Sequence, residues 1–197
     1  MTTPESGELL GTPKAEFLQS VRRALGRGDA PPAEPYPRLT DTLPEMEEKA
    51  SQIRKRLEEN LPVLLDKLGE MAALGGWKVH RASGVEEAIG YIESVARDSE
   101  ATNVVRSAQD VFEHIPVDAA LVNLGLKVTT VARDEANSRE ELREEIRQSG
   151  IGITGADYAL AETGSLVILP RQGLSRLVSL VPPVHIALVR PDDLLES

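Results

Sequence analysis

Between Trp77 and Gln148 the chain alternates short strand-like segments with capped helical segments, and this alternation constrains the fold more than any other feature. Alternating polar and apolar residues predict strands, whereas apolar residues three or four apart predict helices. A strand, a helix and the next strand in sequence normally pack as a parallel unit, with the helix against one face of the sheet. We therefore expect an α/β fold, a three-layer sandwich in which helices cover both faces of a mostly parallel sheet.

The predicted elements of this region have definite bounds. Strands are expected at residues 77–81, 103–106 and 127–131. The first helix is expected after a capping box at Ser83-Gly-Val-Glu86, with an apolar face made of Val85, Ile89, Ile92 and Val95. A second helix is expected at residues 117–124. A third is expected after a capping box at Ser138-Arg-Glu-Glu141 and continues through Ile146, with the ion pairs Glu140/Arg143 and Glu144/Arg147. From residue 150 onward, short strand-like runs separated by Gly and Pro predict hairpins or a ladder of strands. These runs are 151–153, 166–169, 177–178, 180–181 and 186–189.

The first 44 residues have the composition of an appended arm. Thr12-Pro13 is a favourable helix start, and Phe17, Val21 and Leu25 then recur on one helical face. The proline-rich residues 30–37 follow, and they predict an extended linker. We expect two parts, an N-terminal helix with its arm at residues 1–44 and an α/β domain at residues 45–197.

A long helix is predicted at the start of the second part, over residues 45–75. Its apolar residues are three or four apart, and Pro62 is expected to kink or divide it near Asn60. The apolar stripe is compatible with coiled-coil pairing, but it is short and imperfect. A helix that faces the core is therefore the preferred interpretation.

Composition excludes several classes of site. The chain has no cysteine, so it can form no disulfide, thiolate-bound zinc site or cysteine-ligated iron–sulfur cluster. Its net charge of −10 argues against nucleic acid or an anionic membrane as a partner. No signal-peptide pattern opens the chain, and its longest apolar runs are too short to span a bilayer. A soluble, cytoplasmic protein is expected.

Three short motifs resemble known sites but lack their context. Residues 150–155 match G-x-G-x-x-G, yet a helix precedes them and Gln172 stands near the position of the required acid, so we interpret Gly150 as a helix C-cap and not as part of a dinucleotide site. Residues 173–177 lack the second glycine of a nucleophile elbow. The histidines are scattered, which disfavours a zinc site; they are His80, His114 and His185. None of these motifs identifies an enzyme class.

Residues 163–191 contain no aspartate or glutamate, although the chain as a whole is acidic. The same stretch contains four basic or titratable nitrogen groups, namely Arg171, Arg176, His185 and Arg190. One interpretation is an anion-binding site, because arginine forms charge-assisted hydrogen bonds with anions. The other is that buried strands exclude charge. That interpretation explains the apolar runs better than the arginines, and both interpretations stay open.

Just upstream, residues 154–165 combine small, hydroxylic and acidic side chains, with Gly155 and Gly164 as possible turn positions. This segment is either part of a ligand site or a turn whose side chains only satisfy backbone groups. The functional interpretation places both stretches on the two sides of one pocket at the carboxyl ends of the sheet strands. In this pocket Thr154, Thr163 and Gly164 would donate hydrogen bonds to an anion, and Arg176 would supply the positive charge. Asp157 and Glu162 would hold that arginine or orient a water, and His185 would line the wall.

A longer resemblance covers roughly residues 45–197 and is most specific over residues 150–190. It rests on Gly152-Ile-Thr-Gly-Ala-Asp-Tyr-Ala-Leu-Ala-Glu-Thr-Gly-Ser-Leu-Val-Ile168, followed by Arg176-Leu, Pro182-Pro and His185-Ile. These residues resemble the LUD (lactate-utilization) family, and within it most closely the lactate-utilization protein C group. The resemblance implies a fold similar to that of ribose-phosphate isomerase, glucosamine-phosphate isomerase and CoA transferases.

The family resemblance also implies a role in a multi-subunit, iron–sulfur-dependent oxidation of L-lactate to pyruvate. This chain resembles the small subunit that binds no cluster, so the iron–sulfur clusters are expected in Cys-rich partner subunits. Glu162-Thr-Gly164 is faintly similar to the Glu-Asn-Gly of CoA transferases, but its middle residue departs from that pattern. Glu162 is therefore expected to be a site residue and not a nucleophile, and no catalytic residue is assigned.

Two classes of function follow from the sequence. In the first, the chain is a non-redox subunit of a lactate-oxidising complex that binds a small carboxylate or docks its partners. In the second, it is a free-standing enzyme or binding protein on the same fold, with a small anion, a phosphorylated metabolite or a CoA ester as ligand.

Overall fold

The structure is a computed structural model that describes residues 14–24, 42–132, 138–170 and 175–197. The chain divides into two compact units, residues 1–46 and residues 47–197. The first unit contains helix α1, Lys14–Ala24, which confirms the predicted N-terminal helix. The predicted cap at Thr12-Pro13 and the proline-rich linker lie outside the described residues. Within the described ranges, no helix is long and apolar enough to cross a membrane.

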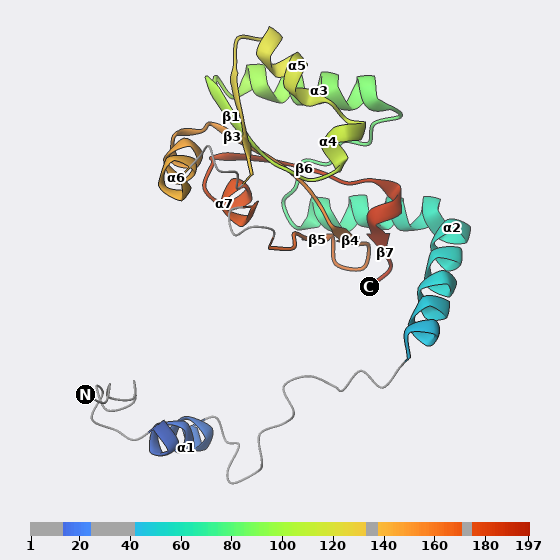
Figure 1. Ribbon diagram of the computed structural model, residues 1–197. Coiled ribbons are helices and arrows are strands. Elements are labelled where there is room, and N and C mark those ends of the chain that lie inside the picture. Colours follow the sequence, from blue (N-terminus) through green and yellow to red (C-terminus); the bar gives the residue numbers. More distant parts are fainter. Residues whose placement is uncertain (1–13, 25–41, 133–137, 171–174) are drawn as a thin grey trace, which may run out of the picture. The chain divides into compact units, whose positions relative to one another are not determined.

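A parallel sheet forms the centre of the second unit (Figure 1). Its described strands are β1 (Asn103–Ser107), β2 (Lys127–Val131), β3 (Ile151–Gly155) and β6 (Val184–Leu188). Their order across the sheet is β2-β1-β3-β6, and each neighbouring pair is parallel. The predicted strands at residues 103–106 and 127–131 are confirmed. From residue 150 onward the chain adds the strands β3 and β6 to this sheet, which agrees with the predicted ladder of strands.

Helices cover both faces of this sheet, so the predicted three-layer sandwich is confirmed (Figure 1). One face carries α3 (Val85–Asp98), α4 (Val111–His114) and α5 (Val117–Asn123), and the other carries α6 (Arg139–Gln148) and α7 (Ser175–Leu180). Successive residues of a strand point to opposite faces. Val104 therefore joins the core beneath α3 and α5, while Val105 joins the core beneath α6 and α7.

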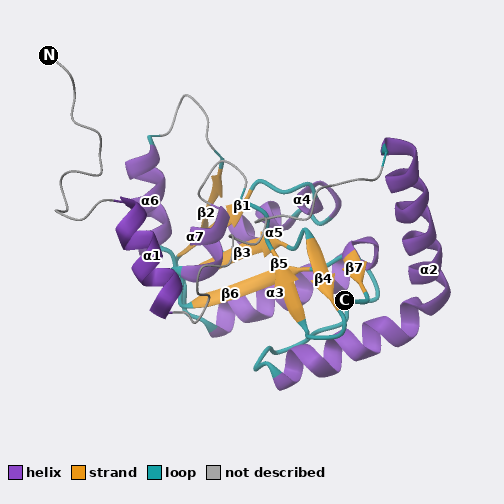
Figure 2. Ribbon diagram, turned by 90° about the horizontal axis from the view of Figure 1, so that it is seen from below, coloured by secondary structure: helices purple, strands orange, loops and turns teal. Residues whose placement is uncertain are grey.

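A smaller sheet and residues 47–74 of the long helix α2, Leu43–Leu74, complete the second unit. The small sheet has the order β5-β4-β7, and its strands are β4 (Tyr158–Leu160), β5 (Ser165–Val167) and β7 (Leu194–Leu195), with a short 3₁₀ turn at Pro191–Asp193. The second half of α2 packs against this sheet, where Leu64 meets Ala159 and Leu194. Pro62 does not divide α2, but the helix bends along its length (Figures 1 and 2). Proline supplies no N–H for the helical ladder, which accounts for a bend.

The strand predicted at residues 77–81 is wrong. Among the described residues this segment pairs with no strand and forms the connection from α2 to α3. Its alternation of apolar and polar residues suggested one buried face. However, the side chains of Trp77 and Val79 are 38% and 50% exposed. The alternation therefore does not reflect a half-buried strand.

The strands predicted at residues 177–178 and 180–181 are also wrong, because α7 spans Ser175–Leu180 and Val181 lies in the bend that follows it. Val178 is fully buried under this helix and packs into the core with Val105. The position of Gly150 differs as well: α6 ends with Ser149 as its C-cap, and Gly150 instead donates its N–H to the Asn103 carbonyl at the start of β1. The glycine is needed there because an added Cβ would lie 2.6 Å from the Ala101 Cβ.

The two predicted capping boxes have different outcomes. The box at Ser138 and Glu141 is confirmed, because each residue's side chain bonds to the other's backbone N–H. At the start of α3 the N-cap is Gly84, and the carboxylate that accepts hydrogen bonds from the Ser83 N–H and hydroxyl belongs to Glu87, not to Glu86. Helix α3 begins one residue later than predicted, which moves the bonding carboxylate along by one position.

Candidate functional site

The carboxyl ends of β1, β3 and β6 lie next to one another in the sheet. From β1 the chain goes to β2 on one side, whereas the next strand, β3, lies on the other side of β1. In open parallel sheets such a reversal of strand order opens a crevice outside the carboxyl ends of the two strands, where ligands bind. The residues that follow β1 and β3 are therefore candidates for a ligand site.

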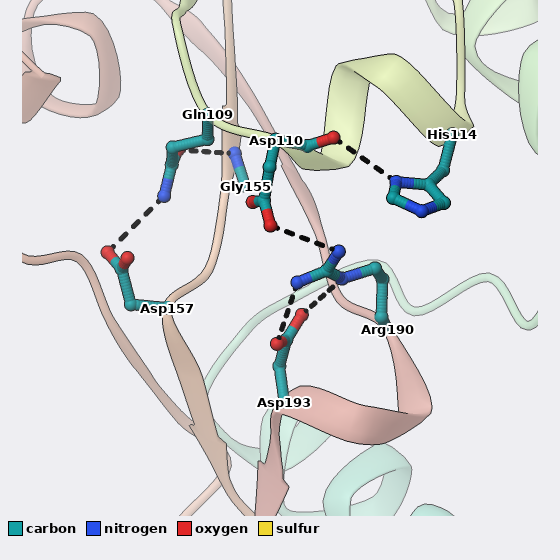
Figure 3. A network of polar contacts seen from close by, with 7 residues as sticks. All are labelled: Gln109, Asp110, His114, Gly155, Asp157, Arg190 and Asp193. Carbon is teal, nitrogen blue, oxygen red and sulfur yellow. Dashed lines mark hydrogen bonds and ion pairs between the residues drawn. The ribbon is translucent and has the colours of Figure 1, made fainter.

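Gln109 joins the loops that follow these two strands (Figure 3). Its side-chain oxygen accepts hydrogen bonds from the Gly155 N–H at 2.8 Å and from the Ser107 hydroxyl at 2.6 Å. Its side-chain nitrogen donates to Asp157 at 3.3 Å. Gln109 is 6% exposed, and Asp157 also accepts from the Leu169 N–H at 2.7 Å. One buried amide thus fixes the loop after β1 to the loop after β3.

Arg190, which follows β6, lies in the same region and is fully engaged (Figure 3). Its guanidinium donates to both carboxylate oxygens of Asp193, at 2.8 and 3.0 Å, and to Asp110 at 3.3 Å. The hydrogen bond with Asp193 is the main cause that raises the pKa of Arg190 above its ordinary value, and the charge of Asp110 adds to it. These partners neutralise the arginine, so Arg190 offers no spare charge to an anion. We call Ser107, Gln109, Asp110, Asp157, Arg190 and Asp193 the carboxyl-end network.

A second polar group lies on the face of the sheet that α7 covers. The hydroxyl of Thr154, which is fully buried, lies 2.9 Å from Nε2 of His185. The ring of Trp77 meets the His185 ring edge-on, with the ring centres 5.7 Å apart. Burial lowers the pKa of His185 below its ordinary value, so the ring is neutral near pH 7. We call Trp77, Thr154 and His185 the imidazole cluster.

Strand pairing explains why the imidazole cluster forms. Gly152 of β3 stands opposite His185 of β6, and Thr154 is two residues further along the same face. A Cβ on Gly152 would lie 1.9 Å from the Val178 carbonyl oxygen, so only glycine lets α7 approach the sheet this closely. The close packing of α7 leaves the imidazole next to Thr154.

The remaining predicted site residues lie in other surroundings. Glu162, Thr163 and Gly164 form the turn between β4 and β5, where Gly164 has a φ of +68° and its Cα faces the backbone of α2 at Ala72. The Thr163 hydroxyl donates to Ser165 at 2.9 Å, and the side chains of Glu162 and Thr163 are exposed.

Arg176 is an exposed residue of α7. Within the part of the chain that the structure describes, no hydrogen bond or ion pair joins Arg176 to Glu162 or Thr163. Of the predicted site residues, Thr154 and His185 are in contact, and His185 lies near the start of β6 and not at its carboxyl end. The larger pocket shared with Arg176 stays a prediction.

Ser107, Gln109 and Asp110 were not predicted as site residues. Their signal in the sequence is a short polar run directly after the strand at 103–107. Among the described residues, no group of three histidine, aspartate or glutamate side chains is placed to hold a metal ion.

This chain is similar to proteins named for lactate utilization. The family model described as LUD domain matches residues 65–197. Lactate utilization protein B of Lysinibacillus sphaericus (strain C3-41) is 29% identical over 184 residues, which cover 70% of this chain and 39% of that protein. Lactate utilization protein B of Bacillus cereus (strain B4264) is 30% identical over 190 residues, which cover 74% of this chain and 40% of that protein.

The chain therefore spans about 40% of the length of the curated relatives it matches. The family expected from residues 150–190 is confirmed, although these relatives carry the name protein B and not protein C. No solved structure matches the chain.

Proposed function

The chain belongs to the LUD domain family, and from this membership we propose that it serves in lactate utilization. The observation that carries the proposal is the family match over residues 65–197, because this range contains every residue of the carboxyl-end network and of the imidazole cluster. Relatives named lactate utilization protein B support it. The part of the chain that resembles them is the part that builds both polar groups.

More specifically, we propose a non-redox subunit that supports the iron–sulfur-dependent oxidation of L-lactate to pyruvate. The 197 residues contain no cysteine and so offer no thiolate to a cluster. The electrons of lactate would then pass to clusters in Cys-rich partner subunits. The contribution of this chain is to bind a small carboxylate or to hold the partners together.

Growth on a defined carbon source tests this proposal. Deleting the gene in the organism that carries it should abolish growth on L-lactate and leave growth on pyruvate unchanged, because pyruvate enters metabolism after the proposed step. Re-expression of the chain should restore growth on lactate. Unimpaired growth of the deletion strain on L-lactate as the sole carbon source would contradict the proposal. Turnover of a phosphorylated or CoA-linked metabolite by the isolated protein would instead favour a free-standing enzyme.

A further inference from the structure

The imidazole cluster combines features that are unusual for this chain. Trp77 is the single tryptophan among 197 residues, of which only 3% are aromatic, and it lies in the irregular connection between α2 and α3. Trp77 remains 38% exposed as a residue while its ring contacts His185. Sites for small organic ligands are typically lined by aromatic or apolar surface with a few convergent polar groups. Trp77 supplies such a surface, and Thr154 and His185 supply the polar groups.

His185 has one ring nitrogen available to a ligand. Its Nε2 is engaged with the Thr154 hydroxyl at 2.9 Å, whereas its Nδ1 has no hydrogen-bond partner among the described residues. No fully enclosed side-chain nitrogen or oxygen of the described residues lacks a partner, so Nδ1 is not completely enclosed by the protein. A neutral imidazole carries one N–H. When the Thr154 hydroxyl donates to Nε2, that N–H is on Nδ1 and points to the open side.

Among the described residues, the printed contacts of the His185 ring are with Thr154 and Trp77 and include no acidic side chain. His185 and the helix α7 both lie in the acid-free stretch 163–191. Among the described residues, no carboxylate forms an ion pair with His185, and burial is the cause of its lowered pKa, not a neighbouring charge. Arg176 of α7 is exposed and is the charged residue of this helix. A carboxylate bound at the imidazole would therefore not have to displace an acidic side chain of the described residues.

We propose that Trp77, Thr154 and His185 form the binding site of a small 2-hydroxy carboxylate, in which His185 Nδ1–H donates to the carboxylate and the Trp77 ring covers its apolar side. The inference rests on the proposed function, since it names the site at which that function would bind lactate. Thr154 acts as a positioning residue, because it engages Nε2 and so leaves the Nδ1 proton for the ligand.

The single tryptophan gives a direct test. A protonated imidazole quenches a neighbouring indole, so Trp77 fluorescence measured against pH should show a transition that reports His185. Adding L-lactate to the purified full chain should move the midpoint upward by about one pH unit, because a nearby carboxylate favours the charged imidazole tenfold. L-lactamide, which has the same shape without the charge, should leave the midpoint in place. His185→Gln should remove the transition, and His114→Gln, in an exposed residue away from Trp77, should keep it.

Each result separates this site from the broader proposal. Lactate binding seen by calorimetry without a change in the midpoint would overturn the site and leave a role in lactate utilization intact. The same conclusion would follow if lactate failed to bind the chain but the deletion strain lost growth on lactate. A shifted midpoint in a chain whose deletion leaves growth on lactate unchanged would support the site and contradict the lactate role. The comparison of lactate with lactamide uses the unmodified chain, so it does not depend on the folding of a variant.

Discussion

In the carboxyl-end network the polar side chains form hydrogen bonds and ion pairs with one another, whereas in the imidazole cluster one ring nitrogen has no partner among the described residues. Gln109 uses both ends of its amide, and Arg190 uses all three of its guanidinium nitrogens. His185 uses Nε2 and leaves Nδ1 without a partner among the described residues. Saturated networks of this kind fix loops in place, because each broken bond leaves a buried group unpaired. An open donor next to an aromatic ring is better suited to a ligand.

The two groups also differ in what holds them together. Side-chain hydrogen bonds between loops build the carboxyl-end network. Close approach of backbones builds the imidazole cluster, since α7 lies so near β3 that Gly152 has no room for a side chain. A substitution at Gly152 and one at Gln109 should therefore damage the protein for different reasons.

The largest effect is expected from Gly152→Ala. The added Cβ would lie 1.9 Å from the Val178 carbonyl oxygen, and backbone cannot yield as a flexible side chain does. Helix α7 would have to move off the sheet, and we expect the free energy of unfolding to fall by about 3 kcal/mol or more, the upper end for overpacked cores. Urea unfolding followed by circular dichroism measures it.

Gly90→Ala is the matched control for this substitution. Gly90 lies within α3 with open space around its Cα, so alanine should raise the free energy of unfolding by about 0.5–1 kcal/mol. An unchanged urea midpoint for Gly152→Ala would mean that α7 is not packed against β3 as closely as the structure shows.

A smaller loss is expected from Gln109→Met, which keeps the length of the side chain and removes its amide. The buried Gly155 N–H and the Ser107 hydroxyl would lose their acceptor. An unsatisfied buried group costs about 1–3 kcal/mol, so we expect the free energy of unfolding to fall by about 2–3 kcal/mol. Gln52→Met, in an exposed residue bonded to Glu48, should have almost no effect.

Gln109→Met also tests whether the carboxyl-end network is structural and the imidazole cluster binds the ligand. If the carboxyl-end network is structural, the folded Gln109→Met protein should still respond to L-lactate in Trp77 fluorescence. Loss of that response in a variant whose circular dichroism without urea still shows the wild-type fold would place Gln109 in the ligand site.

Local pattern was enough to predict the elements whose apolar residues face the core. The strands near 103–107 and 127–131 and the helices that follow them have apolar residues at the spacing that burial requires, and the structure confirms them. The same reasoning failed at residues 77–81, where the alternating side chains are exposed. It also failed at α7, because six residues are fewer than two helical turns and show no period.

The candidate site shows where sequence reasoning reaches its limit. Residues 163–191 are free of acids along the chain, yet Arg190 is paired with Asp193 and with Asp110. One partner lies just beyond the stretch and the other lies in the loop after β1. Likewise the polar run at Ser107 and Gln109 has meaning only once strand order puts β3 beside β1. These contacts depend on which strands are neighbours in the sheet, and the periodicity of the sequence carries no information about strand order.

The smallest predicted effect concerns the pH dependence of stability. Burial lowers the pKa of His185 in the folded state, while the unfolded chain keeps the ordinary value of about 6.5. As the pH falls below that value, the unfolded state takes up a proton more readily than the folded state, so the free energy of unfolding falls. Well above it neither state is protonated, and the contribution of His185 to the pH dependence vanishes.

His185→Gln should therefore lose less stability than the wild type between about pH 7.5 and about pH 5.5, a range that spans the ordinary pKa of histidine. Glutamine preserves a polar group near Thr154 without a titrating proton. His114→Gln is the control, because His114 is exposed and its described contact is with the Asp110 carbonyl. Urea unfolding at both pH values measures the difference. If His185→Gln and the wild type lost equal stability on acidification, the imidazole would not be buried beside Trp77 as the structure shows, and the contrast with the carboxyl-end network would lose its physical basis.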